Sequence, residues 1–138
     1  MENYVKHDRL VQDCVGLIEK CKKDWSSKAE GILGGGGEKE ENQFYVMLRW
    51  SRPKWDGYET VDVVQIAWLP SYRGEKEIEE KKKRSATFLW DALEDAARIV
   101  GRVLRVECVL HQKFIDMLIR ERFYKLQSYT TDCLLCVK

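Results

Sequence analysis

The chain contains two histidines, the side chain that most often exchanges protons near neutral pH. His7 begins a predicted helix, and His111 lies between a predicted strand and a predicted helix. The sequence shows no partner that would orient His111. His111 is therefore a candidate general base, with a place at a helix start or in solvent as the alternative.

The cysteines favour a structural role over a redox or metal role. Cys133 and Cys136 have the C-x-x-C spacing, but in a strand these two positions face opposite sides, and the chain has no second C-x-x-C pair. Cys14 and Cys21 share one face of a predicted helix and are expected in the core. Because the chain has no second C-x-x-C pair, we expect no metal site. The cysteine count of five is odd, and free thiols are the default in a reducing compartment, so we expect no structural disulfide.

Two further patterns bear on phosphate and nucleic-acid binding. The glycines at 34–37 lack the Lys-Ser/Thr pair of a phosphate-binding loop, which predicts a flexible connection instead. Aromatic and basic side chains that could stack on bases and contact phosphates alternate along a predicted hairpin: Phe44, Tyr45, Arg49, Trp50, Arg52, Lys54, Trp55 and Tyr58. Packing of that hairpin on one face is the simpler interpretation.

Hydrophobic periodicity predicts alternating helices and strands. Residues 7–25 repeat apolar side chains at helical spacing. Segments 43–52 and 59–69 are rich in aromatic and β-branched residues, and an Asp-Gly pair within 53–58 is typical of a hairpin turn. Farther on we expect a helix from Ser85 to Gly101, a strand over 103–110, a helix over 112–123 and one or two strands over 124–137.

The second hairpin strand, 59–69, has few polar residues and is expected at the centre of the sheet, covered on both faces. It should pair antiparallel with 43–52. A helix of crossover length follows it, so it should pair parallel with 103–110. The predicted fold class is α/β (α+β), a mixed central sheet flanked by helices.

A run of mixed charge, residues 75–84, precedes the helix predicted from Ser85. Such a run is typically a solvated helix face, and a role in facing phosphate is the alternative. We expect this segment to be exposed and mobile. Ser85 is the expected N-cap of the helix that follows.

Length and composition indicate one folded domain over residues 1–138. Hydrophobic residues make up 44%, charged residues 34%, and the net charge is only +1. This balance lacks the basic excess of nonspecific nucleic-acid binders. No apolar run has the length of a membrane span or signal peptide, so we expect a cytoplasmic protein without membrane contact.

Residues 64–74 read Val-Gln-Ile-Ala-Trp-Leu-Pro-Ser-Tyr-Arg-Gly. This stretch resembles the fourth strand and pyrophosphate loop of the GNAT superfamily of acyl-CoA-dependent N-acetyltransferases, whose usual form is a hydrophobic strand followed by Val-x-Pro-x-Tyr-Arg-Gly. The helix at 86–97, the strand at 104–109 and the helix ending at Arg122-Phe123 are similar to later family segments. The resemblance covers roughly residues 60–137.

The resemblance implies acetyl-CoA as co-substrate. Its pyrophosphate would lie at Arg73, Gly74 and the predicted helix start at Arg84, Ser85 and Ala86, which combines free N–H groups with a positive dipole end. The strands beside 64–69 would splay, and a backbone N–H from Ile66, Ala67 or Trp68 would polarise the thioester carbonyl. Available bases are Glu59, Asp62 and Glu107, with His111 as noted.

The chain also departs from the family pattern. Lys76 and Ile78 occupy glycine places if the helix follows Gly74 directly, and Leu118 stands where the family often has a tyrosine that protonates the departing thiolate. The leading hypothesis is an N-acetyltransferase acting on a primary amine of a small molecule or protein. The alternative is a catalytically inactive GNAT-fold module that binds a protein or nucleic acid. A homodimer through the hairpin edge is left open.

Overall fold

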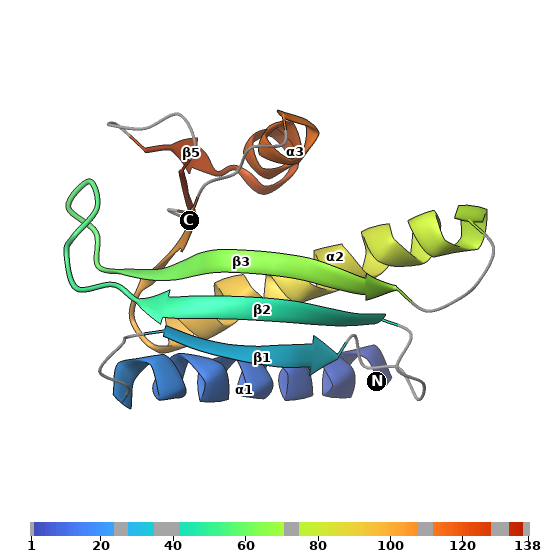
Figure 1. The fold of residues 1–138 in the computed structure, drawn as a ribbon, viewed down its shortest axis with the longest axis horizontal. Coiled ribbons are helices and arrows are strands. Elements are labelled where there is room, and N and C mark those ends of the chain that lie inside the picture. Colours follow the sequence, from blue (N-terminus) through green and yellow to red (C-terminus); the bar gives the residue numbers. More distant parts are fainter. Residues whose placement is uncertain are drawn as a thin grey trace.

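The computed structural model describes residues 2–23, 28–34, 42–70, 75–107, 112–127 and 133–136. The helices are α1 (Glu2–Lys23), α2 (Glu75–Ile99) and α3 (Gln112–Arg122). The strands are β1 (Lys28–Gly34), β2 (Asn42–Trp50), β3 (Thr60–Pro70), β4 (Val103–Val106), β5 (Lys125–Leu126) and β6 (Leu134–Cys136). The predicted mixed α+β class is confirmed (Figure 1).

One mixed sheet runs in the order β1-β2-β3-β4-β6-β5. The first three strands form an antiparallel meander, and β3 then pairs parallel with β4 after the α2 crossover. The last strand, β6, lies antiparallel between β4 and β5. The predicted interior place of β3, with an antiparallel and a parallel neighbour, is therefore confirmed.

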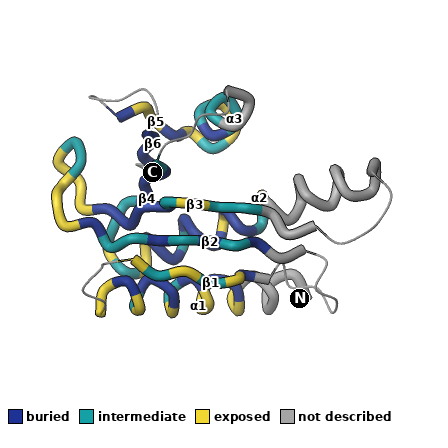
Figure 2. Tube along the Cα trace, viewed as in Figure 1, coloured by how far each residue is buried: buried dark blue, intermediate teal, exposed yellow. Residues whose placement is uncertain are grey.

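The hydrophobic core lies on one face of this sheet. α1 and α2 pack against each other and run along that face (Figure 1). All three helices contribute side chains to one buried cluster. Along α1, buried and exposed positions alternate, as expected for a helix with one face in the core (Figure 2). From β3 and β4 the cluster receives Val61, Val63, Leu104 and Val106. We call this the helix face, and the opposite side of the sheet the second face.

The prediction that β3 is covered on both faces is wrong at Gln65. Val61, Asp62 and Val63 are buried, whereas Gln65 is exposed and Ile66 and Ala67 are half-buried. Gln65 and Ala67 lie on the second face, so this face of β3 is only partly covered there, whereas Ile66 packs against the core cluster of the helix face. Within the described residues, no helix is long and apolar enough to cross a membrane.

The predicted start of the second helix is also wrong. α2 begins at Glu75, so the run 75–84 forms its first turns and Ser85 lies well inside the helix. Residues with strong helix propensity make up this run and extend the helix without an apolar stripe of their own. Its predicted exposure and mobility fall on side chains outside the described ones.

Two turns follow their sequence signals. Gly101 ends α2 with a φ of 76°, and Arg102 N donates to Ala97 O at 2.9 Å, as in a left-handed C-cap. Asp56 and Gly57 both have positive φ, and Trp55 and Tyr58 bridge across them. This is the turn that an Asp-Gly pair favours between antiparallel strands. The turn folds the β2–β3 connection into a small hairpin.

Candidate functional site

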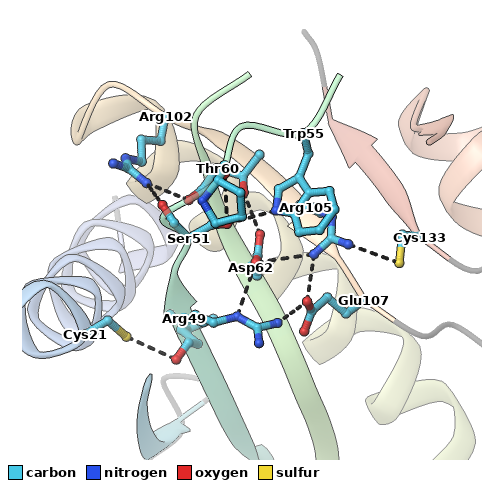
Figure 3. Close-up of polar contacts among 12 residues, drawn as sticks. Cys21, Arg49, Ser51, Trp55, Thr60, Asp62, Arg102, Arg105, Glu107 and Cys133 are labelled. Carbon is cyan, nitrogen blue, oxygen red and sulfur yellow. Dashed lines mark hydrogen bonds and ion pairs between the residues drawn. The ribbon is translucent and has the colours of Figure 1, made fainter. Parts of the chain in front are cut away.

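A row of opposite charges crosses the second face of the sheet. Arg49 on β2 is the register partner of Asp62 on β3, and Asp62 is in turn the partner of Arg105 on β4. Arg49 Nε lies 3.4 Å from Asp62 Oδ2, and Arg105 Nη1 lies 3.3 Å from the same oxygen. Glu107, two residues after Arg105, completes the set (Figure 3). We call Arg49, Asp62, Arg105 and Glu107 the charge row.

Asp62 is the most enclosed member of the charge row, with 1% of its side chain exposed. Burial raises its pKa above the ordinary value. A 2.6 Å hydrogen bond from Thr60 Oγ1 and the charge of Arg105 only partly oppose that rise. The carboxyl group of Asp62 is therefore fixed by its neighbours and is not accessible to a ligand.

Glu107 and Arg49 form the more open end of the charge row. Their side chains are 14% and 26% exposed. Glu107 uses Oε1 for both of its ion pairs, one with Arg49 Nη2 and one with Arg105 Nη1 at 2.7 Å. Its Oε2 and the Nη1 group of Arg49 make no such contact within the described residues. Glu107 and Arg49, a hydrogen-bond acceptor and a donor of opposite charge, therefore lie side by side and can each bind a further group.

Arg105 connects the charge row to a buried polar group at the β5–β6 end of the sheet. Its Nε donates to Gln127 Oε1 at 2.8 Å, and its Nη2 donates to Cys133 Sγ at 3.4 Å. The ring of Trp55 lies 4.0 Å from the guanidinium carbon and covers it. Gln127 Nε2 is buried and has no hydrogen-bond partner among the described residues. This cluster holds an unused donor, which is costly in a folded interior.

The described pairing of β3 with β4 ends beside the charge row. Their pairing covers Thr60–Val63 and Val103–Val106, and Glu107 N donates to Val63 O at 3.0 Å. On the other edge of β3, Met47 pairs with Gln65 while Leu48 pairs with Val63, so Val64 is an extra residue in a bulge. Beyond Val63, β3 continues to Pro70 without a described strand partner on its β4 side.

The predicted base candidates separate into two places. Asp62 and Glu107 meet in the charge row, whereas Glu59 pairs with Arg102 at 3.1 Å and is 59% exposed. Arg102 also donates to Ser51 O and Thr60 O and stacks 3.5 Å from the Trp50 ring centroid, so this second site ties the chain ends of β2 and β3 together. His111 lies outside the described residues.

The residues predicted to hold CoA are only partly brought together. Ile66, Ala67 and Trp68 lie on β3 past the bulge, and their predicted contact with the thioester stays a prediction. Arg73 and Gly74 lie outside the described residues. Arg84, Ser85 and Ala86 lie within α2, so their backbone N–H groups are not at a helix start, and this part of the prediction is wrong.

Sequence reasoning missed Arg105 and Gln127, and it named Arg49 only as a possible phosphate contact. Arg105 sits in the apolar strand Val-Leu-Arg-Val with 4% of its side chain exposed, and that contrast was the available signal. Three of the five aromatic residues considered for base stacking are engaged internally: Phe44 is in the core, Trp50 lies under Arg102, and Trp55 covers Arg105, whereas Tyr58 is exposed.

A second polar cluster lies between α2 and the end of α3. Glu94 accepts from Arg122 Nε at 2.7 Å and from Tyr124 Oη at 2.8 Å, and Asp91 also pairs with Arg122. Burial, reinforced by Glu94, raises the pKa of Tyr124 well above its ordinary value. Tyr124 is 2% exposed, so this phenol is a structural donor.

Comparisons with known proteins add no relative: no family model, no curated protein and no solved structure matches this chain.

Proposed function

We propose that this chain is an acyl-CoA-dependent N-acyltransferase of the GNAT type that acetylates a primary amine. The observation that carries the proposal is that the described pairing of β3 with β4 ends at Val63, next to the bulge at Val64. An exposed strand edge can hydrogen-bond an extended amide-containing ligand, as in strand addition. The amide-rich arm of acetyl-CoA would lie along residues 64–70 in this way.

The reaction would take place next to Glu107. The amine nitrogen attacks the thioester carbonyl, a C–N bond forms, the C–S bond breaks, and CoA leaves as a thiolate. A backbone N–H of residues 66–68 would stabilise the oxyanion. The amine proton would go to Glu107 Oε2, because Asp62 is enclosed while Glu107 is part-exposed beside the last described β3–β4 pair. The thiolate would take a proton from solvent, since Leu118 is buried and carries no acid.

The start of α2 at Glu75 provides the pyrophosphate position in this proposal. Free N–H groups and the positive dipole end now fall directly after Gly74, where the resemblance places the loop. Glu75 and Glu77 in this first turn add negative charge, and Lys76 adds positive charge. We therefore expect weaker pyrophosphate binding than a glycine-rich turn would give.

A noncatalytic interaction module is the second candidate. It is favoured by the two arginines that already hold Glu107 Oε1 and by the complete burial of Leu118 at the place of the family tyrosine. A carboxylate between two guanidinium groups is a weak proton acceptor. This candidate keeps the fold and gives up acetyl transfer.

Calorimetric titration with acetyl-CoA, followed by thiol release with a panel of primary amines, separates the two. We expect micromolar binding and turnover with at least one amine. Lys76→Glu should weaken binding by adding a carboxylate to the first turn of α2, whereas the same charge change at exposed Lys20 on α1 should not. Absence of acetyl-CoA binding would contradict the proposal, and binding without turnover would favour the noncatalytic module.

A further inference from the structure

The unused polar atoms at the open end of the charge row indicate what kind of amine fits there. Arg49 uses Nε toward Asp62 and Nη2 toward Glu107, so its Nη1 group remains available at a side chain that is 26% exposed. Glu107 uses Oε1 for both arginines, so Oε2 remains available. Among the described residues, one guanidinium edge and one carboxylate oxygen thus remain without a partner on two side chains in direct contact.

We propose that the acceptor is a free α-amino acid, whose carboxylate binds Arg49 and whose amine faces Glu107. The proposal rests on the N-acyltransferase function proposed above and names its substrate class. Arginine presents paired N–H donors that match a carboxylate, and a carboxylate oxygen is the natural acceptor for an ammonium or amine. Because Arg49 and Glu107 touch, the two charged groups of the ligand must be only a few bonds apart. An α-amino acid meets that condition.

The neighbouring groups hold this arrangement in place without filling it. Asp62 Oδ2 lies 3.4 Å from Arg49 Nε, and Arg105 Nη1 lies 2.7 Å from Glu107 Oε1. These two ion pairs hold Arg49 and Glu107 in position. Trp55 covers Arg105, so a ligand meets the charge row from the Arg49–Glu107 end. The row contains two cations and two anions, and it therefore attracts a zwitterion without favouring a strongly charged ligand of either sign. A long polyamine or an acidic peptide fits this balance less well.

The test is calorimetry on the full chain without acetyl-CoA, using three matched probe sets: the common L-α-amino acids, the amines that lack only the carboxylate, and the N-acetyl amino acids. At least one free amino acid should bind, and its decarboxylated and N-acetylated counterparts should bind about tenfold more weakly or worse. Equal affinity for the decarboxylated amine would overturn the proposal, as would absence of binding by every amino acid.

Variants locate the site. Arg49→Gln should weaken amino-acid binding about tenfold or more while leaving acetyl-CoA affinity unchanged, and exposed Arg98→Gln on α2 serves as the matched control. Glu107→Gln, which keeps side-chain size, is the second variant if Arg49→Gln fails to fold. Acetyl-CoA binding without amino-acid binding would remove the substrate class alone. Amino-acid binding without acetyl-CoA binding would remove the acyltransferase function alone.

Discussion

The charge row and the Glu94 cluster are two buried polar groups built from similar side chains, yet they differ in completeness. Glu94 uses both carboxylate oxygens, toward Arg122 and Tyr124, between elements that pack in one core. In the charge row, Glu107 works through one oxygen and Arg49 is part-exposed. Next to the charge row, Gln127 Nε2 lacks a partner in the part of the chain that the structure describes.

This difference distinguishes polar side chains that only stabilise the fold from polar side chains that can also bind a ligand. The Glu94 cluster, in which both carboxylate oxygens are hydrogen-bonded, stabilises the packing of α2 against the α3–β5 connection and has no acceptor left for a ligand. The charge row, which lies where the described β3–β4 pairing ends, can still form hydrogen bonds to a ligand, and its unused polar atoms lower the stability of the fold.

The largest expected effect is in the Glu94 cluster. Glu94→Gln should lower the free energy of unfolding by about 3 kcal/mol, because it leaves the buried Arg122 guanidinium without its main counter-charge. Glu107→Gln should cost about 1 kcal/mol or less, because Asp62 still pairs with both arginines. Urea denaturation of both variants measures the two costs. Equal costs would show that the two clusters have the same structural role.

The pH dependence of stability should carry the sign set by Asp62. Its folded-state pKa is raised above the unfolded value of 3.8, so the folded chain binds the proton more tightly. The contribution of Asp62 to stability is therefore present below pH 3.8 and is lost as the pH rises toward the folded pKa.

Urea unfolding of the parent chain and of Asp62→Asn across this pH range isolates that contribution. The stability of the parent relative to the variant should fall with rising pH and then level off. A relative stability that rises with pH would mean that the arginines outweigh burial and that Asp62 is a simple ion-pair partner.

The smallest expected effect concerns the end of α3, next to the Glu94 cluster. Phe123 has a φ of 62°, a left-handed conformation that is costly for a residue with a Cβ, and 70% of it is exposed. Phe123→Gly should raise the free energy of unfolding by about 0.5 to 1 kcal/mol. Thermal unfolding measures this, with Phe123→Ala as the control that keeps the strain. A loss of stability in the glycine variant would show that the Phe123 side chain makes a contact that outweighs the strain.

The sheet arrangement was largely predictable because it depends on local signals. The apolar segment 59–69, its Asp-Gly hairpin and the crossover helix together determine an antiparallel and a parallel neighbour for β3. β1 was missed because residues 28–34, Lys-Ala-Glu-Gly-Ile-Leu-Gly, combine two glycines with few β-branched side chains. The start of α2 was misplaced because an apolar stripe appears only from Phe88 onward, although the charged run before it is a strong helix former.

The candidate site was less predictable for a different physical reason. Asp62 and Glu107 were named through the family resemblance, but the cations that hold them come from two other strand positions. Arg49 and Arg105 meet Asp62 only because of the registers of β2 with β3 and of β3 with β4. Register depends on pairing between distant segments, and a single sequence does not display it.

Backbone amide NMR during an acetyl-CoA titration tests most directly the proposal that acetyl-CoA binds along β3 beyond its last described pair with β4. We expect the amide signals of Val64, Gln65, Ile66, Ala67 and Trp68 to shift with micromolar affinity, while those of β1, at the far edge of the sheet, stay in place. Unchanged signals along β3 at saturating acetyl-CoA, or shifts confined to other elements, would contradict the account.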